Sequence, residues 1–174
     1  MKKIALILLL LLPFLANAQQ SQLNSFFEKY SGKDGYTSVY ISSYMFELFK
    51  KISNKSEEKE FNDIITRLKS IKILTVDSVT NINSKIKFQK ELLSILPKNI
   101  YKELMIVKDG SETVSFLFRN EGDKISEFVM TVEGSGSPVL IFLEGDIDLK
   151  QLSKLSKTMN IKGFEHLDKV DEKK

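Results

Sequence analysis

Three carboxylates alternate near the C-terminal end of the chain, and they are the residues whose chemistry first needs an explanation. Glu144, Asp146 and Asp148 follow an apolar run at every second position. Spaced acids can bind a hard cation such as Ca²⁺, and two carboxyls across an open cleft can hydrolyse a glycosidic bond. The glycine and the further acids of an EF-hand loop are missing, so we predict no metal site. The structural alternative is that Gly145–Asp146 forms a turn and that Asp148 caps a helix.

His166 is the only histidine of the chain, and the other candidate motifs are equally incomplete. A histidine that acts as a general base needs a nucleophile and an orienting acid, and the nearness in sequence of Glu165 and Asp168 does not supply that geometry. A zinc site would need further histidines or cysteines, which the chain lacks. The S-x-x-K motifs at 56–59 and 84–87 have no K-T-G or S-D-N partner. The sequence therefore identifies no catalytic residue, metal-ligand set or cofactor, and the three acids and His166 remain the only candidates.

The first 18 residues have the three-part layout of a secretory signal peptide. Two lysines follow the initiating methionine, an apolar run extends over Ile4–Leu12, and Ala16-Asn17-Ala18 matches the small-x-small pattern of a cleavage site. The run is too short for a membrane-spanning helix. We therefore expect an exported protein, periplasmic or secreted, that begins at Gln19. A lipoprotein signal would place a cysteine at that position, so we expect no lipid anchor.

The composition after residue 18 fits a single soluble domain that needs no disulfide bond. Removal of 18 residues leaves 156, with no cysteine in a chain that is 42% hydrophobic. Loss of the two signal lysines leaves 24 basic and 23 acidic side chains, so no basic excess favours nucleic acid. No later apolar stretch approaches the roughly 20 residues of a spanning helix. We expect one domain over 19–167 and a charged, frayed tail over 168–174.

The N-terminal half alternates predicted helices and strands. Leu23, Phe26, Phe27 and Tyr30 form one apolar stripe, which predicts a helix over 21–32. Strands are predicted over 36–42 and 70–77, because both are rich in β-branched or aromatic residues. Three further helices are predicted from their apolar stripes. The first stripe is Met45, Leu48, Phe49 and Ile52, and the second, after a cap at Ser56, is Phe61, Ile64, Ile65 and Leu68. The third helix, between Thr80 and Pro97, has Ile82, Ile86, Leu93 and Leu96 facing inward.

The C-terminal half predicts a four-strand meander followed by a helix. Three strands are predicted around Leu104 and Ile106, over 114–118 and over 125–133, separated by the turn signals Asp109-Gly110 and 120–123. A fourth, buried strand is predicted over 139–143. Asp148 would cap the last helix, whose apolar side is Leu149, Leu152, Leu155 and Met159. The fold class is therefore α+β: an antiparallel sheet that includes the C-terminal meander, with helices packed on it and a C-terminal helix.

Twelve phenylalanines could line an apolar pocket, but we expect most of them to build the core. Those placed in predicted core stripes are Phe26, Phe27, Phe49, Phe61, Phe116 and Phe142.

Four stretches of the chain carry a resemblance to a known family. They are YSGKDGYTSVYIS at 30–42, LKSIKILT at 68–75, YKELMIVKDGSETVSFLFR at 101–119 and GDIDLKQLSKLSKTMNIKGFEHL at 145–167. With them the chain resembles the exported bacterial domain-of-unknown-function family 4252 (DUF4252). The resemblance implies a small envelope protein of gram-negative-type bacteria and supplies no catalytic residue, because that family has no assigned activity. Genes of relatives often lie near extracytoplasmic-type sigma factor systems, which implies a link to envelope stress.

Three functional hypotheses follow from these observations. The first is a noncatalytic binding module whose partner is an envelope protein, and it would show an exposed apolar patch. The second is a carboxylate-based hydrolase that uses Glu144, Asp146 and Asp148. The third is a carrier of a small apolar ligand, which would need a cavity of at least about 300 Å³.

Overall fold

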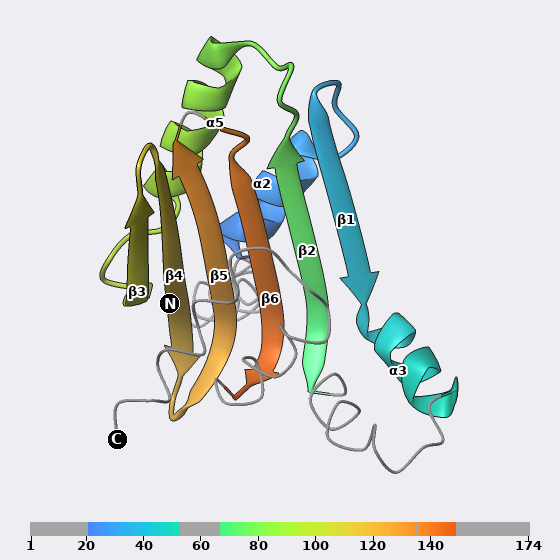
Figure 1. Cartoon of the computed structure of the whole chain (residues 1–174). Coiled ribbons are helices and arrows are strands. Elements are labelled where there is room, and N and C mark those ends of the chain that lie inside the picture. The colour runs from blue at the N-terminus through green and yellow to red at the C-terminus, as the bar shows by residue number, and fades with distance from the viewer. Residues whose placement is uncertain (1–20, 53–66, 135, 149–174) are drawn as a thin grey trace, which may run out of the picture.

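A single antiparallel sheet of six strands forms the framework of the protein (Figure 1). The computed structural model describes residues 21–52, 67–134 and 136–148. The strand order is β1-β2-β6-β5-β4-β3, and three helices accompany the sheet in the described part of the chain. This is the predicted α+β class. The elements are α2 (Gln22–Tyr30), β1 (Tyr36–Ser42), α3 (Ser43–Ile52), β2 (Leu68–Val76), α5 (Ile82–Ser94), β3 (Lys102–Asp109), β4 (Glu112–Glu121), β5 (Lys124–Gly134) and β6 (Val139–Ile147).

The predicted C-terminal meander is confirmed. Strands β3 to β6 pair consecutively, and β2 and then β1 extend the sheet on the far side of β6. The turn signal Asp109-Gly110 closes the β3–β4 hairpin, where Asp109 pairs with Glu112 and Gly110 has a φ of 56°. A positive φ is strained for residues that carry a Cβ, so glycine suits this turn.

Helices α2 and α5 pack on the same face of the sheet, which is called the helix face below (Figure 1). The stripe predicted for α2 is confirmed, because Leu23, Phe26, Phe27 and Tyr30 are all buried. Phe88 of α5 lies against this helix, with its ring centroid 5.1 Å from those of Phe26 and Tyr30. The two helices are therefore fixed to the sheet through an aromatic cluster as well as through aliphatic contacts.

The opposite face of the sheet is also apolar. Its buried side chains include Ile71, Phe116, Phe128 and Ile141. Within the described segments, Phe46 of α3 is the one helical side chain in this cluster.

The buried side of α5 differs from the predicted stripe. Ile82, Ile86 and Leu93 are exposed, and Lys85, Phe88 and Leu92 are buried instead. The fourth predicted position, Leu96, is buried as expected, just after the end of the helix. The helix carries two apolar stripes, one with Ile82, Ile86 and Leu93 and one with Phe88 and Leu92. The second stripe faces the sheet, because the ring of Phe88 fills the space beside α2. Lys85 is tolerated there because its ammonium group donates to the carbonyl oxygen of Ser78 at 3.0 Å. The helix begins at Ile82, after an Asn81 cap rather than at Thr80.

Three further predictions are corrected. Phe49 is not a core residue, because α3 turns Phe46 toward the sheet and leaves Phe49 exposed. Gly145–Asp146 is not a turn, because β6 continues to Ile147. Leu68 begins β2 rather than ending a helix.

Several predictions lie outside the described residues. They are the signal peptide over 1–18, the helix after Ser56, the C-terminal helix after Asp148 and the tail over 168–174.

Candidate functional site

Glu144 belongs to a polar network between α2 and the sheet. Its carboxylate accepts hydrogen bonds from Asn24 Nδ2 at 3.0 Å and from Ser70 Oγ at 2.8 Å, and lies 3.7 Å from Lys72 Nζ. Lys72 Nζ also donates to Asn24 Oδ1. Ser70 and Lys72 are both buried, so the Ser70 hydroxyl is not open to a substrate that would use it as a nucleophile. Both carboxylate oxygens are occupied by neighbours, and this arrangement stabilises the α2–sheet packing.

The other candidate acids lie apart from this network. Asp146 Oδ2 is 2.6 Å from Lys124 Nζ, and this hydrogen bond lowers the pKa of the Asp146 carboxyl. Asp148 is exposed at the end of the described segment, and His166 lies outside it. Within the described ranges, no three Asp, Glu or His side chains are arranged to hold a metal ion. The sequence therefore located the acids correctly at the end of β6, but Glu144 and Asp146 are held by different cations.

A second carboxylate network, around the buried Glu127, was not found by the sequence reasoning. Glu127 on β5 is only 2% exposed, and it accepts hydrogen bonds from the Tyr101 hydroxyl and from Arg119 Nη2, both at 2.6 Å. Burial and the neighbouring carboxylate raise the pKa of Tyr101. Arg119 faces Glu127 across the β4–β5 pair, a relation that only the strand register reveals.

The largest unexplained feature is an apolar surface formed by α3 and the adjoining edge of β1. We define the α3–β1 surface as the exposed apolar side chains Val39, Tyr44, Met45, Leu48 and Phe49, together with Tyr40 on the other face of the same edge. Tyr40 lies on the helix face, where its ring centroid is 5.4 Å from Lys72 Nζ. Tyr44 is 68% exposed, Tyr40 60% and Phe49 48%. An apolar arc covers more than half of the circumference of α3, and among its described side chains Phe46 alone is buried against the sheet. Tyr44, Met45, Leu48 and Phe49 are exposed, which is unusual unless another molecule covers them.

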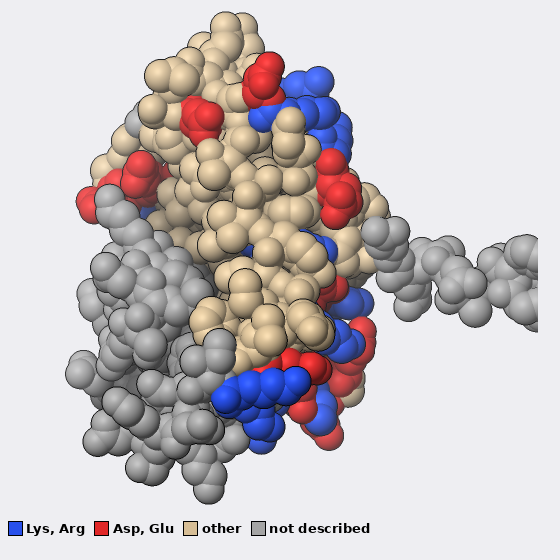
Figure 2. Space-filling view, turned by 90° about the vertical axis from the view of Figure 1, so that its right-hand side faces the viewer, with Lys and Arg blue, Asp and Glu red and all other residues tan. Residues whose placement is uncertain are grey.

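The two edges of the sheet are built differently. Edge strand β3 carries Lys102, Glu103, Lys108 and Asp109, and its pairing with β4 is interrupted between Glu103 and Met105. Charges and bulges of this kind protect an edge against pairing with other chains. Edge strand β1, Tyr36–Ser42, has no charged residue, no proline and an uninterrupted register with β2. Figure 2 looks onto the β1 edge, and its central surface is mostly uncharged, with most of the charged side chains around it.

The pairing of β1 with β2 determines which backbone groups face outward. Asp77 N donates to Gly35 O, so the hydrogen-bonded pairs fall on odd-numbered residues of β1. Ser38, Tyr40 and Ser42 therefore direct their N–H and C=O groups away from β2. No described segment pairs with β1 on that side.

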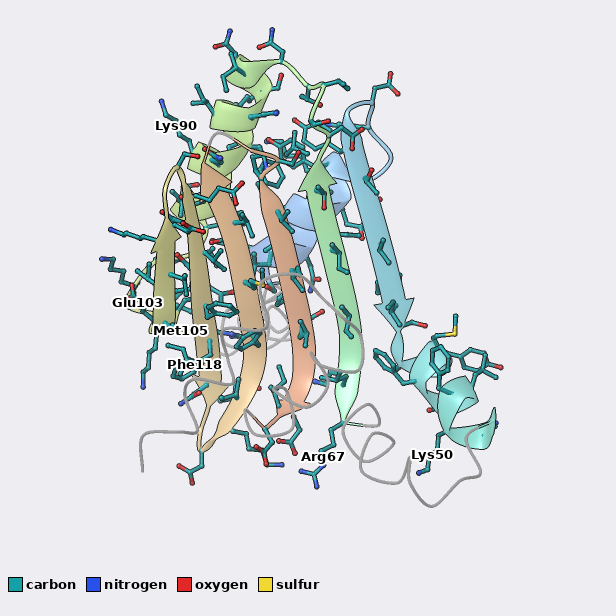
Figure 3. The ribbon with its side chains drawn as sticks, viewed as in Figure 1. Lys50, Arg67, Lys90, Glu103, Met105 and Phe118 are labelled. Carbon is teal, nitrogen blue, oxygen red and sulfur yellow. The ribbon has the colours of Figure 1, made fainter. Side chains whose placement is uncertain are left out.

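The end of the α3–β1 surface is positively charged. Lys50 of α3 and Arg67, just before β2, lie at the same end of the molecule (Figure 3). Lys50 and Lys51 also line a pocket of about 580 Å³ under α3, together with Phe46, Glu47 and Leu68.

A second hollow lies on the helix face, beside the C-terminal end of α5. This hollow, called the α5 cleft, has a volume of about 370 Å³. Its apolar part is formed by Leu93, Leu96 and Leu117, and its polar part includes Thr131 and Glu133 of β5. Burial raises the pKa of the Glu133 carboxyl.

Two comparisons with known proteins gave no match, and one did. A family model described as a domain of unknown function (DUF4252) matches residues 30–155. No curated protein and no solved structure matches the chain. None of the helices in the described ranges is long and apolar enough to cross a membrane.

Proposed function

The chain belongs to the DUF4252 family, a domain of unknown function, and from that premise we propose that it is an exported, noncatalytic interaction module. Its site would be the α3–β1 surface. Its partner would be a protein that adds an extended, apolar segment to the open edge of β1. The observation that carries this proposal is the uncharged edge strand beside four exposed apolar side chains of one short helix.

Strand addition uses both features of this surface. An extended segment would satisfy the outward N–H and C=O groups of Ser38, Tyr40 and Ser42, and backbone hydrogen bonds would set its register. Its alternate side chains would pack on Tyr40 on the helix face, and on Val39 and the apolar arc of α3 on the opposite face. Complete burial of a large apolar side chain contributes about 1.5–3 kcal/mol, so a few such contacts support a specific complex. Lys50 and Lys51 favour an acidic residue beside the apolar part of the segment.

A partner protein fits this surface better than a second copy of the chain does. Two copies paired antiparallel through β1 would be related by a two-fold axis, which would place the turn before one β1 beside the α3 of the other. That turn contains Lys33 and Asp34, both exposed, and charged side chains do not complement the apolar arc. Figure 1 shows that this turn and α3 lie at opposite ends of β1.

The proposal includes the address predicted from the sequence. Residues 1–18 would direct export and be removed, and the module would then act in the envelope or outside the cell. A partner that exposes an extended apolar segment only when it is misassembled would connect the module to envelope stress. The predicted C-terminal helix after Asp148 is part of the same proposal, and helical NMR secondary shifts over 149–159 would support it.

Site-specific photo-crosslinking in cells tests the proposal. A photoreactive phenylalanine analogue replaces Tyr40 in one variant and Ile106 in the control, and cross-linked proteins are identified by mass spectrometry. The two-residue turn Gly110–Ser111 places Ile106 at an outward-facing edge position of β3, which makes it a matched control. We expect one envelope protein to cross-link through a defined segment at Tyr40 and not at Ile106. Equal cross-linking at both edges, or cross-links only between copies of the chain, would contradict the proposal.

The backbone contribution is tested with the recovered partner and purified protein. Ser38→Pro removes an outward N–H without removing a β1–β2 hydrogen bond, and edge strands tolerate proline at such positions. Ser38→Ala controls for loss of the hydroxyl, which lies 2.9 Å from Ser31 Oγ. Affinity should fall at least tenfold for the proline variant and stay within twofold for the alanine variant.

A further inference from the structure

The α5 cleft has the size and lining of a small-molecule site. Pockets that bind small molecules usually have volumes of about 300–1,000 Å³ and are mostly apolar with a few polar groups. The α5 cleft, at about 370 Å³, combines the apolar side chains Leu93, Leu96 and Leu117 with the carboxylate of Glu133. These residues come from three separate parts of the chain, so only the folded structure brings them together.

Glu133 differs from other carboxylates that are withdrawn from water in this protein. Glu91, Glu127 and Glu144 each lie within ion-pair distance of a Lys or Arg side chain. Glu133 has Thr131 Oγ1 as a hydrogen-bond donor at 3.3 Å, and no ion pair links it to another residue of the described segments. A partly buried carboxylate without a cation is costly, and a bound cation would remove that cost.

The other end of the α5 cleft has a different charge pattern. Glu133 pairs with Thr113 on β4, whereas Glu103 pairs with Leu117, four residues further along the same strand. The two ends are therefore about 13 Å apart along β4. Lys98 and Lys102 are exposed at the Glu103 end, and they disfavour a second positive charge there. The apolar side chains lie between the two ends.

We propose that the α5 cleft binds a small monoamine with an apolar chain, its ammonium group at Glu133 and its chain over Leu96 and Leu117. This inference is independent of the partner site, because β1 and α3 lie at the other side of the sheet from β3 and β4 (Figure 1). In Figure 3, Glu103 and Met105 of β3 and Phe118 of β4 mark the cleft side of the sheet, and Lys50 of α3 marks the opposite side.

Titration of the purified protein with n-hexylamine tests the proposal, with n-hexanol and n-hexanoate as probes of equal chain length. Binding is followed by the backbone amide NMR shifts of Leu117, Thr131 and Glu133. We expect saturable shifts with n-hexylamine, and at least tenfold weaker binding of both other probes. Equal binding of n-hexanol, tighter binding of n-hexanoate, or absence of saturation would overturn the proposal.

Two substitutions make the test specific to Glu133. Glu133→Gln keeps the shape and removes the charge, and Glu28→Gln makes the same change on the exposed side of α2. The first should weaken n-hexylamine binding at least tenfold and the second should leave it unchanged. Leu93→Lys places an ammonium group at an exposed position of the cleft and should also weaken binding. Unchanged binding in Glu133→Gln and Leu93→Lys would overturn the proposal.

Discussion

At the residue scale, one buried carboxylate, Glu127, and one partly buried carboxylate, Glu144, stabilise the fold through specific partners. Glu127 is held by a tyrosine and an arginine, and Glu144 by an asparagine, a serine and a lysine. Removal of one partner leaves a buried acceptor with an unmet hydrogen bond, and that loss exceeds the net gain from forming the bond.

Tyr101→Phe removes one of the two partners of Glu127 and keeps the ring. We expect the free energy of unfolding to fall by about 1–2 kcal/mol in urea denaturation. Tyr44→Phe is the matched control, because the Tyr44 side chain is exposed, and it should change stability by less than about 0.5 kcal/mol. A similar loss in both variants would show that the Glu127 contact contributes nothing specific.

Substitution of Glu133 should stabilise the fold, whereas loss of a Glu127 partner should destabilise it. Its pKa is raised in the folded state by burial, so folding penalises its ionised form. That penalty is absent below the unfolded-state pKa, near pH 4, and is complete at pH values above the folded-state pKa. At pH 7, Glu133→Gln should therefore raise the free energy of unfolding by about 0.5 kcal/mol relative to the unchanged protein, as measured by urea denaturation. The difference should be smaller at pH 4. A variant less stable at pH 7 would contradict this assignment.

The residue-scale chemistry was only partly accessible from sequence. Alternation identified Glu144 and Asp146 as neighbours at the end of a strand, but their partners Asn24 and Lys124 are distant in sequence. Glu127 and Glu133 gave no signal, because their burial and partners depend on strand pairing and on the position of α5.

At the element scale, patterns with one apolar stripe were predicted well and patterns with two were not. The bounds of β1 and the buried side of α2 agree with the prediction, because each has a single plausible inward face. Helices α3 and α5 offer several apolar positions around their circumference. Contact with a neighbouring element then decides which position is buried, and Phe88 beside α2 is the clearest case.

Helix α3 allows a direct test of which phenylalanine supports the fold. Phe46→Ala should lower the free energy of unfolding by about 3–4 kcal/mol, because Phe46 is buried against the sheet. Phe49→Ala should cost less than about 1 kcal/mol, because that side chain is half exposed. Urea denaturation of the two variants checks the difference, and equal losses would mean that both rings are core residues.

Gly145 provides a second test at this scale. It has a φ of 151°, and a Cβ there would lie 2.4 Å from the carbonyl oxygen of Arg67 and 2.7 Å from Leu68 Cα. Gly145→Ala must therefore shift the backbone where β6 meets β2, at a cost of about 3 kcal/mol. Gly110→Ala has open space around the added carbon and should cost about 1–2 kcal/mol. Calorimetric melting temperatures should separate the two variants, and a smaller decrease for Gly145→Ala would contradict the packing at this position.

At the scale of the whole molecule, the sheet has one protected edge and one open edge. Charged side chains and an irregular register mark β3, whereas β1 is uncharged and regular and continues into a helix with exposed apolar side chains. The sequence predicted all six strands, and it left their order open, because the order depends on long-range pairing. Which strands lie at the edges, and hence where a partner could add a strand, became visible only in the structure.

Residue-resolved amide hydrogen exchange of β1, with and without the partner segment, tests this account most directly. Ser38, Tyr40 and Ser42 should exchange rapidly in the free protein, because their N–H groups face outward. Addition of the partner segment should slow exchange at these three alternate positions, while the corresponding outward-facing amide of Ile106 on β3 stays unchanged. If the partner segment binds and exchange at Ser38, Tyr40 and Ser42 stays unaltered, strand addition at β1 is contradicted.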